Sequence, residues 1–207
     1  MILLTAFEPF DETGMNSSQA ALTEFLLRQR NRLPVDGIIL PVAYNSDFRS
    51  LLPQIDRLQP SAILLTGQST HSAIAVELKA VNLKLITLRS EPGNPSSHTY
   101  PIIPSAPQSY ETTVPASHLV SAIKDAGVPA FTSDDAGTYA CNHIFFRSLH
   151  HTHTRALNIP VGFLHFPRLP EQAIAIMGNE TRVPSMSLDL LVWALEAAVT
   201  TVLTQSS

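Results

Sequence analysis

Short, continuous apolar runs alternate with segments of helical periodicity along this chain, and this alternation constrains the fold more than any other feature. The runs at 2–7, 62–66 and 159–167 contain too few polar residues for strands with one face in water. Strands of this kind are buried on both faces, which is typical of a parallel sheet with helices on each side. The sequence therefore predicts an α/β fold, a three-layer α/β/α sandwich around a twisted, largely parallel or mixed sheet.

The remaining elements follow from turn residues and apolar spacing. Asn16 is a candidate helix N-cap before an apolar stripe that runs to about Arg30. The stretch 90–115 is rich in Pro, Ser and Asn, so we expect a long irregular loop that forms a lid or stays disordered. No linker or internal repeat divides the chain, and residues 1–207 are expected to form a single domain. Further strands are expected at 37–43, 83–88 and 130–133, and helices at 46–58, 115–126, 141–155 and 188–203.

Composition limits the classes of partner and cofactor. Only 14% of the 207 residues are charged and the net charge is -4, so the basic surface that binds nucleic acids or anionic membranes is missing. The single cysteine excludes an intramolecular disulfide and suits a reducing compartment, so we expect a cytoplasmic protein. The apolar stretch 188–203 is interrupted by Asp189 and Glu196 and is not expected to span a membrane. Because there is no Gly-rich phosphate loop, no nucleotide cofactor is expected.

The single cysteine, Cys141, stands where a loop enters a helix. The small and polar residues around Gly137 are typical of a loop, whereas Ile144, Phe145 and Leu149 recur at helical spacing. The first N–H groups of a helix have no partner within it and the helix dipole is positive there, so a thiolate is favoured and an oxyanion can be bound. Cys141 is therefore a candidate nucleophile, although a lone cysteine is also a common small core residue.

A cysteine nucleophile needs a base, and the base needs a group that fixes its tautomer. His165 lies near the end of the apolar run 159–167, and Glu77 is set in the otherwise apolar stretch 74–82. These two residues are the candidates for base and orienting carboxylate. Spacing alone leaves open whether they meet Cys141, or whether His165 is a core residue and Glu77 forms an ordinary ion pair.

A cluster of histidines offers a rival interpretation as a metal site. His150 and His153 share one face of the expected helix, and His143 and His151 are close in sequence. The spacing matches no established zinc pattern such as H-E-x-x-H, and histidines are favoured at a helix C-terminus by the dipole. A solvated helix end explains the cluster better, and no metal site is predicted.

Three segments together resemble a known family. They are the stretch 5–10 followed by Asn16, the stretch 137–142 around the cysteine, and the stretch 162–172 around the histidine. A fourth segment, Glu77 and the residues after it, is similar to a glutamate motif of the same family. With these segments the chain resembles pyroglutamyl peptidase I, also called pyrrolidone-carboxylate peptidase, over nearly its whole length.

The resemblance implies an enzyme of phosphorylase/hydrolase-like fold that removes N-terminal pyroglutamate from peptides without metal or cofactor. Its catalytic triad carries over as Cys141, His165 and Glu77, with a thioester intermediate. The resemblance also implies a homo-oligomer, either a tetramer or a dimer.

The resemblance further implies a pocket for the pyroglutamate ring. Phe7 and Phe10 match the aromatic residues that hold the ring, Gln68 and Ala140 line the same pocket, and Asn16 supports the first loop. Both phenylalanines are also ordinary candidates for core packing.

The chain departs from the family pattern at several positions. Asp11 and Glu12 replace two glycines, and Leu78 replaces the arginine after the glutamate. Thr87 occupies the ungapped position of a second arginine, with Arg89 nearby. Loss of one oxyanion donor costs on the order of 10²-fold or more in rate, so we expect reduced activity or altered specificity. Two alternatives follow: a divergent amidase acting on another small lactam or acyl amide, or a catalytically weakened homologue that binds pyroglutamyl groups.

Overall fold

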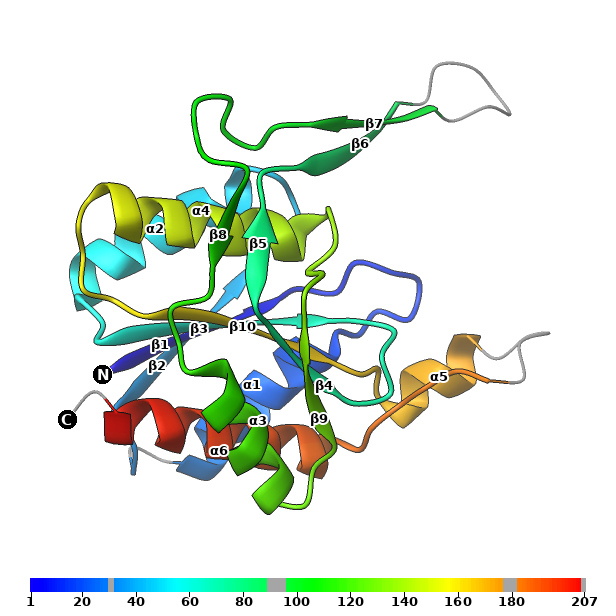
Figure 1. Cartoon of the computed structure of the whole chain (residues 1–207). Coiled ribbons are helices and arrows are strands. Elements are labelled where there is room, and N and C mark those ends of the chain that lie inside the picture. The colour runs from blue at the N-terminus through cyan, green and yellow to red at the C-terminus, as the bar shows by residue number, and fades with distance from the viewer. Residues whose placement is uncertain (30–31, 89–95, 177–181, 206–207) are drawn as a thin grey trace.

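A six-stranded mixed sheet forms the centre of the structure (Figure 1). The computed structural model describes residues 1–29, 32–88, 96–176 and 182–205. The first four strands in sheet order run parallel to one another, whereas the fifth is antiparallel to the fourth and parallel to the sixth. In sheet order the strands are β2 (Val35–Leu40), β1 (Ile2–Phe7), β3 (Ala62–Gln68), β10 (Val161–Phe166), β4 (Ile74–Glu77) and β9 (Ala130–Ser133).

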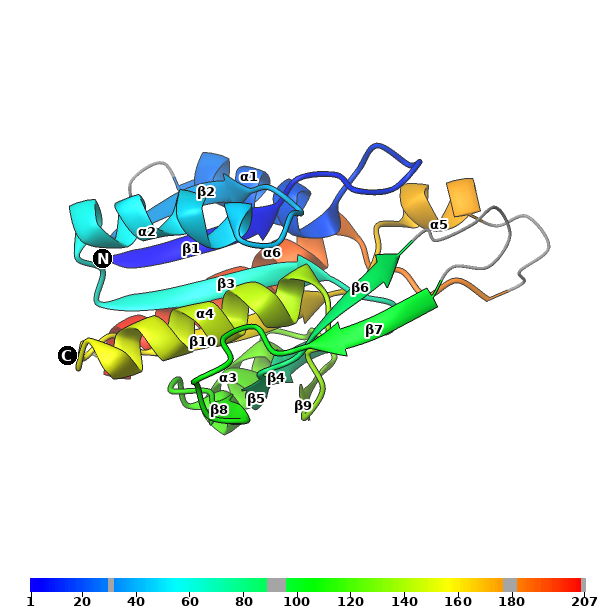
Figure 2. The ribbon, with the colours of Figure 1, turned by 90° about the horizontal axis from the view of Figure 1, so that it is seen from above.

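Helices cover both faces of this sheet (Figures 1 and 2). Alternate residues of the strands enter separate cores, so Leu4 of β1 packs with the helices of one layer and Leu3 with those of the other. The expectation of an α/β/α sandwich with a mixed sheet is confirmed. The layers consist of α1 (Ser17–Gln29), α3 (Ala116–Asp125) and α6 (Leu188–Gln205) on one face, and α2 (Ser46–Leu58) and α4 (Ala140–Thr154) on the other.

The C-terminal helix α6 is strongly apolar although it contains Asp189 and Glu196. By length and mean hydropathy (1.3 over 18 residues) it would be long and apolar enough to cross a membrane. In the structure it is a core helix, because Leu191, Leu195 and Val199 are fully buried and the helix packs against α1 and α3. Packing within the protein therefore accounts for its apolar character.

Two small sheets lie beside the main one. β5 (Lys79–Val81) pairs with β8 (Ser109–Glu111), and β6 (Lys84–Leu88) pairs with β7 (Ser96–Tyr100). The β6–β7 pair projects beyond the helical layer (Figures 1 and 2). The expectation of an irregular loop over 90–115 is therefore wrong for β7 and β8, while residues 90–95 lie outside the described residues.

Local signals in the sequence place most element ends within a few residues. The N-cap at Asn16 is confirmed, since its Oδ1 accepts a hydrogen bond of 3.0 Å from the backbone N–H of Ser18. The short helix α5 (Pro170–Ile176) was not expected, because the sequence there has no long apolar stripe.

A glycine in β10 allows close packing behind the sheet. A Cβ built on Gly162 would overlap Cγ2 of Val114 and come within 3.1 Å of its Cγ1. The branched side chain of Val114 is stiff and buried, so it has little freedom to move aside. We expect Gly162→Ala to lower the free energy of unfolding by about 1–3 kcal/mol in urea titrations.

The double variant Gly162→Ala/Val114→Ala tests the cause of that loss. Removing both Cγ atoms of Val114 relieves the overlap, so the two changes should cost less together than the sum of the single changes. Additive losses would contradict this explanation.

Candidate active site

The carboxyl ends of β1, β3 and β10 meet at one edge of the sheet because these strands are parallel. Phe7 ends β1, Gln68 ends β3, and His165 is the last residue but one of β10. The ends of strands in an open α/β sheet are where such folds bind ligands. Three of the sequence candidates are thus brought together by strand direction alone.

Cys141 is the second residue of α4 and is partly buried. The turn before it is held by Gly137, which has a φ of +75° and donates its backbone N–H to Oδ1 of Asp135 at 2.8 Å. A positive φ is accessible to glycine without steric cost, so this residue allows the turn that leads into the helix. The expected position of the thiol at the start of a helix is confirmed.

His165 and Glu77 form a buried pair. Nδ1 of His165 lies 2.7 Å from Oε1 of Glu77, and the carboxylate is fully buried. The antiparallel pairing of β10 with β4 sets His165 opposite Ala75, and Glu77, two residues further along β4, therefore lies on the same face of the sheet.

Cys141 completes this set beside the imidazole, close enough for its negative charge to raise the pKa of His165. The thiol sits close against the backbone of β3, since a Cβ built on Gly67 would lie 2.6 Å from its Sγ. Gly67 thus leaves room for the sulfur beside the sheet. The three catalytic candidates meet in one place, as the resemblance implied.

The surroundings of His165 favour its charged form. Burial lowers the pKa of the imidazole, but the negative charge and hydrogen bond of Cys141, followed by those of Glu77, outweigh burial and raise the pKa to about 10. An imidazolium next to a thiolate is the resting state that a cysteine nucleophile needs.

A cavity of about 870 Å³ opens in front of Cys141 and His165. Each of the five residues that the resemblance assigned to the substrate pocket lines it: Phe7, Phe10, Asn16, Gln68 and Ala140. The other lining residues were not predicted to belong to the pocket. They come from the segment after β2, the loop after β3, the strand β6 and the turn before α4: Val42, Ala43, Tyr44, Ser69, Thr70, His71, Leu85, Ile86, Asp135, Ala136, Gly137 and Tyr139.

The two phenylalanines differ in exposure. Phe7 is buried at the end of its strand, whereas the side chain of Phe10 is 55% exposed at the cavity. Core packing therefore explains Phe7 in part but does not explain Phe10. An exposed aromatic side chain beside a cavity is available to cover an apolar ligand.

Gln68 is held by one end of its amide. Its Oε1 accepts the backbone N–H of Ser17 at 2.8 Å, while its Nε2 is buried and has no hydrogen-bond partner within the described part of the chain. Asn16 holds the loop before α1, since its Nδ2 donates to the carbonyl of Glu8 at 3.1 Å. Gln68 thus lines the cavity and carries a buried donor that no described residue satisfies.

The histidine cluster does not form one site. His143 is fully buried and its Nδ1 lies 2.7 Å from Oδ2 of Asp47, whereas His150 is bonded through Nδ1 to the hydroxyl of Tyr110 at 2.9 Å. Across residues 1–29, 32–88, 96–176 and 182–205, no group of three or more His, Cys, Asp or Glu side chains is arranged to hold a metal ion.

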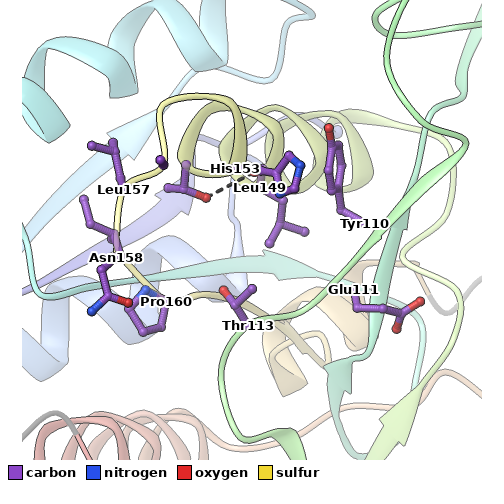
Figure 3. A pocket seen from close by; sticks show the side chains of 11 residues that line it. Tyr110, Glu111, Thr113, Leu149, His153, Leu157, Asn158 and Pro160 are labelled. Carbon is purple, nitrogen blue, oxygen red and sulfur yellow. Dashed lines mark hydrogen bonds between the residues drawn. The ribbon is translucent and has the colours of Figure 1, made fainter.

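A second cavity, of about 490 Å³, lies at the C-terminal end of α4 (Figure 3). Tyr110, His153 and Asn158 are among its lining residues. It contains none of the candidate catalytic or substrate-binding residues.

The positions that depart from the family pattern belong to separate segments of the structure. Asp11 closes a local turn by accepting hydrogen bonds from the N–H and hydroxyl of Thr13, and Glu12 lies in the same loop. Leu78 is half-buried and packs against the core that contains α3 and α6. Thr87 belongs to β6, whose Leu85 and Ile86 line the cavity, and Arg89 lies outside the described residues.

The fold and the site together are those of a thiol-dependent hydrolase. The chain belongs to the pyroglutamyl peptidase family, whose model matches residues 1–205.

Curated relatives agree with this assignment. The chain is 35% identical to pyrrolidone-carboxylate peptidase 1 of Photorhabdus laumondii, over 99% of this chain and 94% of that protein. It is 36% identical to the pyrrolidone-carboxylate peptidase of Vibrio vulnificus, over 98% of this chain and 92% of the relative.

Solved structures agree in fold. Pyrrolidone carboxyl peptidase from Pyrococcus furiosus superposes with a TM-score of 0.89 at 29% identity, covering 100% of this chain and 99% of that one. Pyroglutamyl peptidase I from Bacillus amyloliquefaciens gives 0.85 at 29% identity, covering 100% and 96%. The chain is therefore an enzyme of this peptidase family with the family's α/β fold.

Removal of the thiol should lower the pKa of His165. Cys141→Ala deletes the largest of the influences that raise this pKa and leaves burial, which lowers it, and Glu77, which raises it less than Cys141 does. NMR titration of the His165 imidazole should place its pKa below that of the wild type, and an unchanged pKa would contradict the coupling.

The same shift predicts a pH dependence of stability. The folded pKa of about 10 lies above the unfolded value of about 6.5. Protonated His165 therefore stabilises the fold fully below pH 6.5, and this contribution is lost as the pH rises towards 10. In urea titrations between pH 6.5 and 10, the stability of the wild type should fall more than that of Cys141→Ala.

Proposed function

We propose that this enzyme removes N-terminal pyroglutamate from peptides with Cys141 as nucleophile, His165 as general acid and base, and Glu77 as the carboxylate that orients the imidazole. The observation that carries the proposal is the 2.7 Å contact between Nδ1 of His165 and Glu77, beside Cys141 at the cavity. Glu77 bonds one imidazole nitrogen, which leaves Nε2 for the thiol and the leaving group.

In the acylation step, the thiolate of Cys141 attacks the carbonyl carbon of the pyroglutamyl residue while the proton of the thiol is held by His165. The imidazolium then gives that proton to the nitrogen of the departing amine as the C–N bond breaks. This leaves a thioester on the sulfur and a free peptide amino terminus.

The start of α4 supports charge on the carbonyl oxygen during attack. The N–H groups of its first turn, which includes Cys141, have no acceptors within the helix and lie at the positive end of its dipole. In the second step, His165 takes a proton from water, the hydroxide attacks the thioester, and the sulfur leaves as thiolate. Free pyroglutamate is released.

The neutral lactam ring needs apolar walls and a few fixed polar partners. Phe7, Phe10 and Ala140 supply apolar surface at the cavity, and the unpartnered Nε2 of Gln68 is a donor for the lactam carbonyl. Asn16 keeps the loop of Phe10 in place through its bond to Glu8.

The wider family pattern supplies the rest of the proposal. From the sequence and the resemblance we propose that residues 1–207 form a single domain and that the protein is cytoplasmic. We also propose a homo-oligomer, either a tetramer or a dimer, and catalysis without metal or cofactor. Thr87 stands on β6, beside the cavity-lining residues of that strand, where the family has an arginine. The absence of this arginine is expected to reduce the rate or change the specificity.

The first experiment is release of a fluorogenic amine from a pyroglutamyl amide. We expect turnover by the wild type, none above background for Cys141→Ala, and loss in the wild type on alkylation by iodoacetamide. Glu77→Gln should lower kcat roughly 10²-fold or more, because the imidazole loses its orienting charge. Glu111→Gln changes an exposed carboxylate of β8 outside this cavity, so it is the matched control and should retain full activity.

Other outcomes separate the alternatives. Turnover of another lactam amide, with little on pyroglutamyl substrates, would indicate the divergent amidase. Saturable binding of pyroglutamyl amide without turnover would indicate the weakened homologue. Full activity in Cys141→Ala would refute the mechanism altogether.

Gln68→Glu tests recognition of the ring. The substitution keeps an oxygen for the N–H of Ser17 and replaces the free donor with an acceptor. We expect KM to rise roughly tenfold or more, because the lactam carbonyl then faces an acceptor. Gln54→Glu, on the surface of α2 next to Arg57, changes the net charge equally and should leave KM unchanged.

A further inference from the structure

The segment that leads into α2 contacts the turn before the nucleophile, and the proposed mechanism does not use this contact. The hydroxyl of Tyr44 lies 2.7 Å from the carbonyl oxygen of Leu85 in β6 and 3.1 Å from that of Thr138, three residues before Cys141. Both carbonyls only accept, so the hydroxyl donates its one proton to this pair of oxygens. Tyr44 thereby connects one wall of the cavity to the turn that carries the thiol.

The carbonyl of Thr138 accepts a hydrogen bond from a second donor, which belongs to Leu85. The backbone N–H of Leu85 donates to it at 2.8 Å. A peptide unit is planar, so fixing the carbonyl of Thr138 fixes the peptide plane that ends at the Cα of Tyr139, the residue before α4. Tyr139 is the N-cap of this helix, in an extended conformation, and Cys141 follows two residues later. The orientation of this peptide, together with the extended backbone of Tyr139, therefore sets where the first turn of α4 begins.

The ring of Tyr44 is itself held in place. It packs on the imidazole of His143 at 5.2 Å between centroids, and His143 is bonded to Asp47, with both side chains fully buried. Because His143 lies on the first turns of α4 and Asp47 on the first turn of α2, this pair fastens the two helix starts together.

Asn45, the residue between Tyr44 and α2, has a strained backbone. Asn45 has a φ of +67°, and its Oδ1 accepts a hydrogen bond from Arg147 of α4 at 3.4 Å. The segment 44–48 is therefore held against α4 by several contacts, and the cost of the unusual backbone at Asn45 is offset by them.

We propose that Tyr44 is a positioning residue for Cys141: its hydroxyl holds the Thr138 carbonyl and β6 together, and so fixes the thiol relative to His165 and to the cavity wall. This rests on the proposed function of Cys141 as nucleophile. Tyr44 is one of the residues that line the cavity, while its hydroxyl proton is committed to the backbone. Its effect should therefore be on the rate of the chemical step rather than on substrate binding.

The test compares Tyr44→Phe with a matched variant at the other end of α4. Tyr110→Phe also removes one hydroxyl, which is bonded to His150 at 2.9 Å and lies beside the second cavity (Figure 3). Both variants keep their rings and lose one hydrogen bond, so their melting temperatures should fall by similar small amounts. Only Tyr44→Phe should change the chemistry at Cys141.

Two readouts are measured for each variant. For Tyr44→Phe we expect kcat on a fluorogenic pyroglutamyl amide to fall roughly 10- to 100-fold with KM within twofold of the wild type, since small displacements of a reacting group cost this much. The rate of alkylation of Cys141 by iodoacetamide should fall several-fold. The chain has one cysteine, so a single adduct in the mass spectrum reports this site alone.

The outcomes are distinct. Values of kcat and alkylation rate within twofold of the wild type in Tyr44→Phe would overturn the proposal, as would equal losses in Tyr110→Phe. If the wild type failed to cleave pyroglutamyl amides, the proposed function would fail, yet the alkylation rates would still decide whether Tyr44 positions the thiol.

Discussion

The buried contact between His165 and Glu77 is the interaction on which the geometry of the candidate active site depends. A carboxylate with no exposed surface is costly unless it is paired, and here the pairing uses one oxygen, since Oε2 has no hydrogen-bond partner among the described residues. The pair therefore gains most when the imidazole is charged. A sheet core would be more stable with apolar side chains at these positions, so chemistry at the neighbouring thiol is the better explanation for both residues.

The geometry of this pair follows from one reversal of strand direction. The parallel strands β1, β3 and β10 bring Phe7, Gln68 and His165 to one edge of the sheet, as parallel strands must. Glu77 reaches His165 because β4 runs against β10 and presents alternate residues to the same face. If β4 ran parallel to β10, its last residue would lie at a different position along β10. Close approach of Cys141 then requires a residue without a side chain at position 67 of β3.

Most of the fold could be predicted from local patterns, but the direction of β4 could not. Continuous apolar runs identify β1, β3 and β10, and Asn16 marks the start of α1, because burial and capping act over a few residues. The stretch around Glu77 carries no signal for strand direction, which is set by pairing with residues almost 90 positions away. The strands β7 and β8 were missed for a related reason: in a Pro- and Ser-rich stretch, pairing with β5 and β6 decides their structure.

The candidate site shows the same division. Motif resemblance identified residues that line the cavity from β1, β3 and α4, whereas Tyr44 and Leu85 were missed, since no motif or local pattern connects their separate segments to the site. The presence of a suitable residue type, such as a buried histidine, does not by itself identify a catalytic residue either.

Two buried histidine–carboxylate pairs adjoin α4, and they have the same distance of 2.7 Å. In the sequence, His143 and His165 both lie among apolar residues, so the composition around them does not separate their roles. The difference is access. His165 lines the cavity and touches Cys141, while Nε2 of His143 is sealed in the core with no hydrogen-bond partner in the part of the chain that is described. A base must exchange protons with a reacting group, which only His165 can reach. His143 can therefore affect the chemistry only indirectly, through its ring contact with Tyr44 and its hydrogen bond to Asp47 at the start of α2.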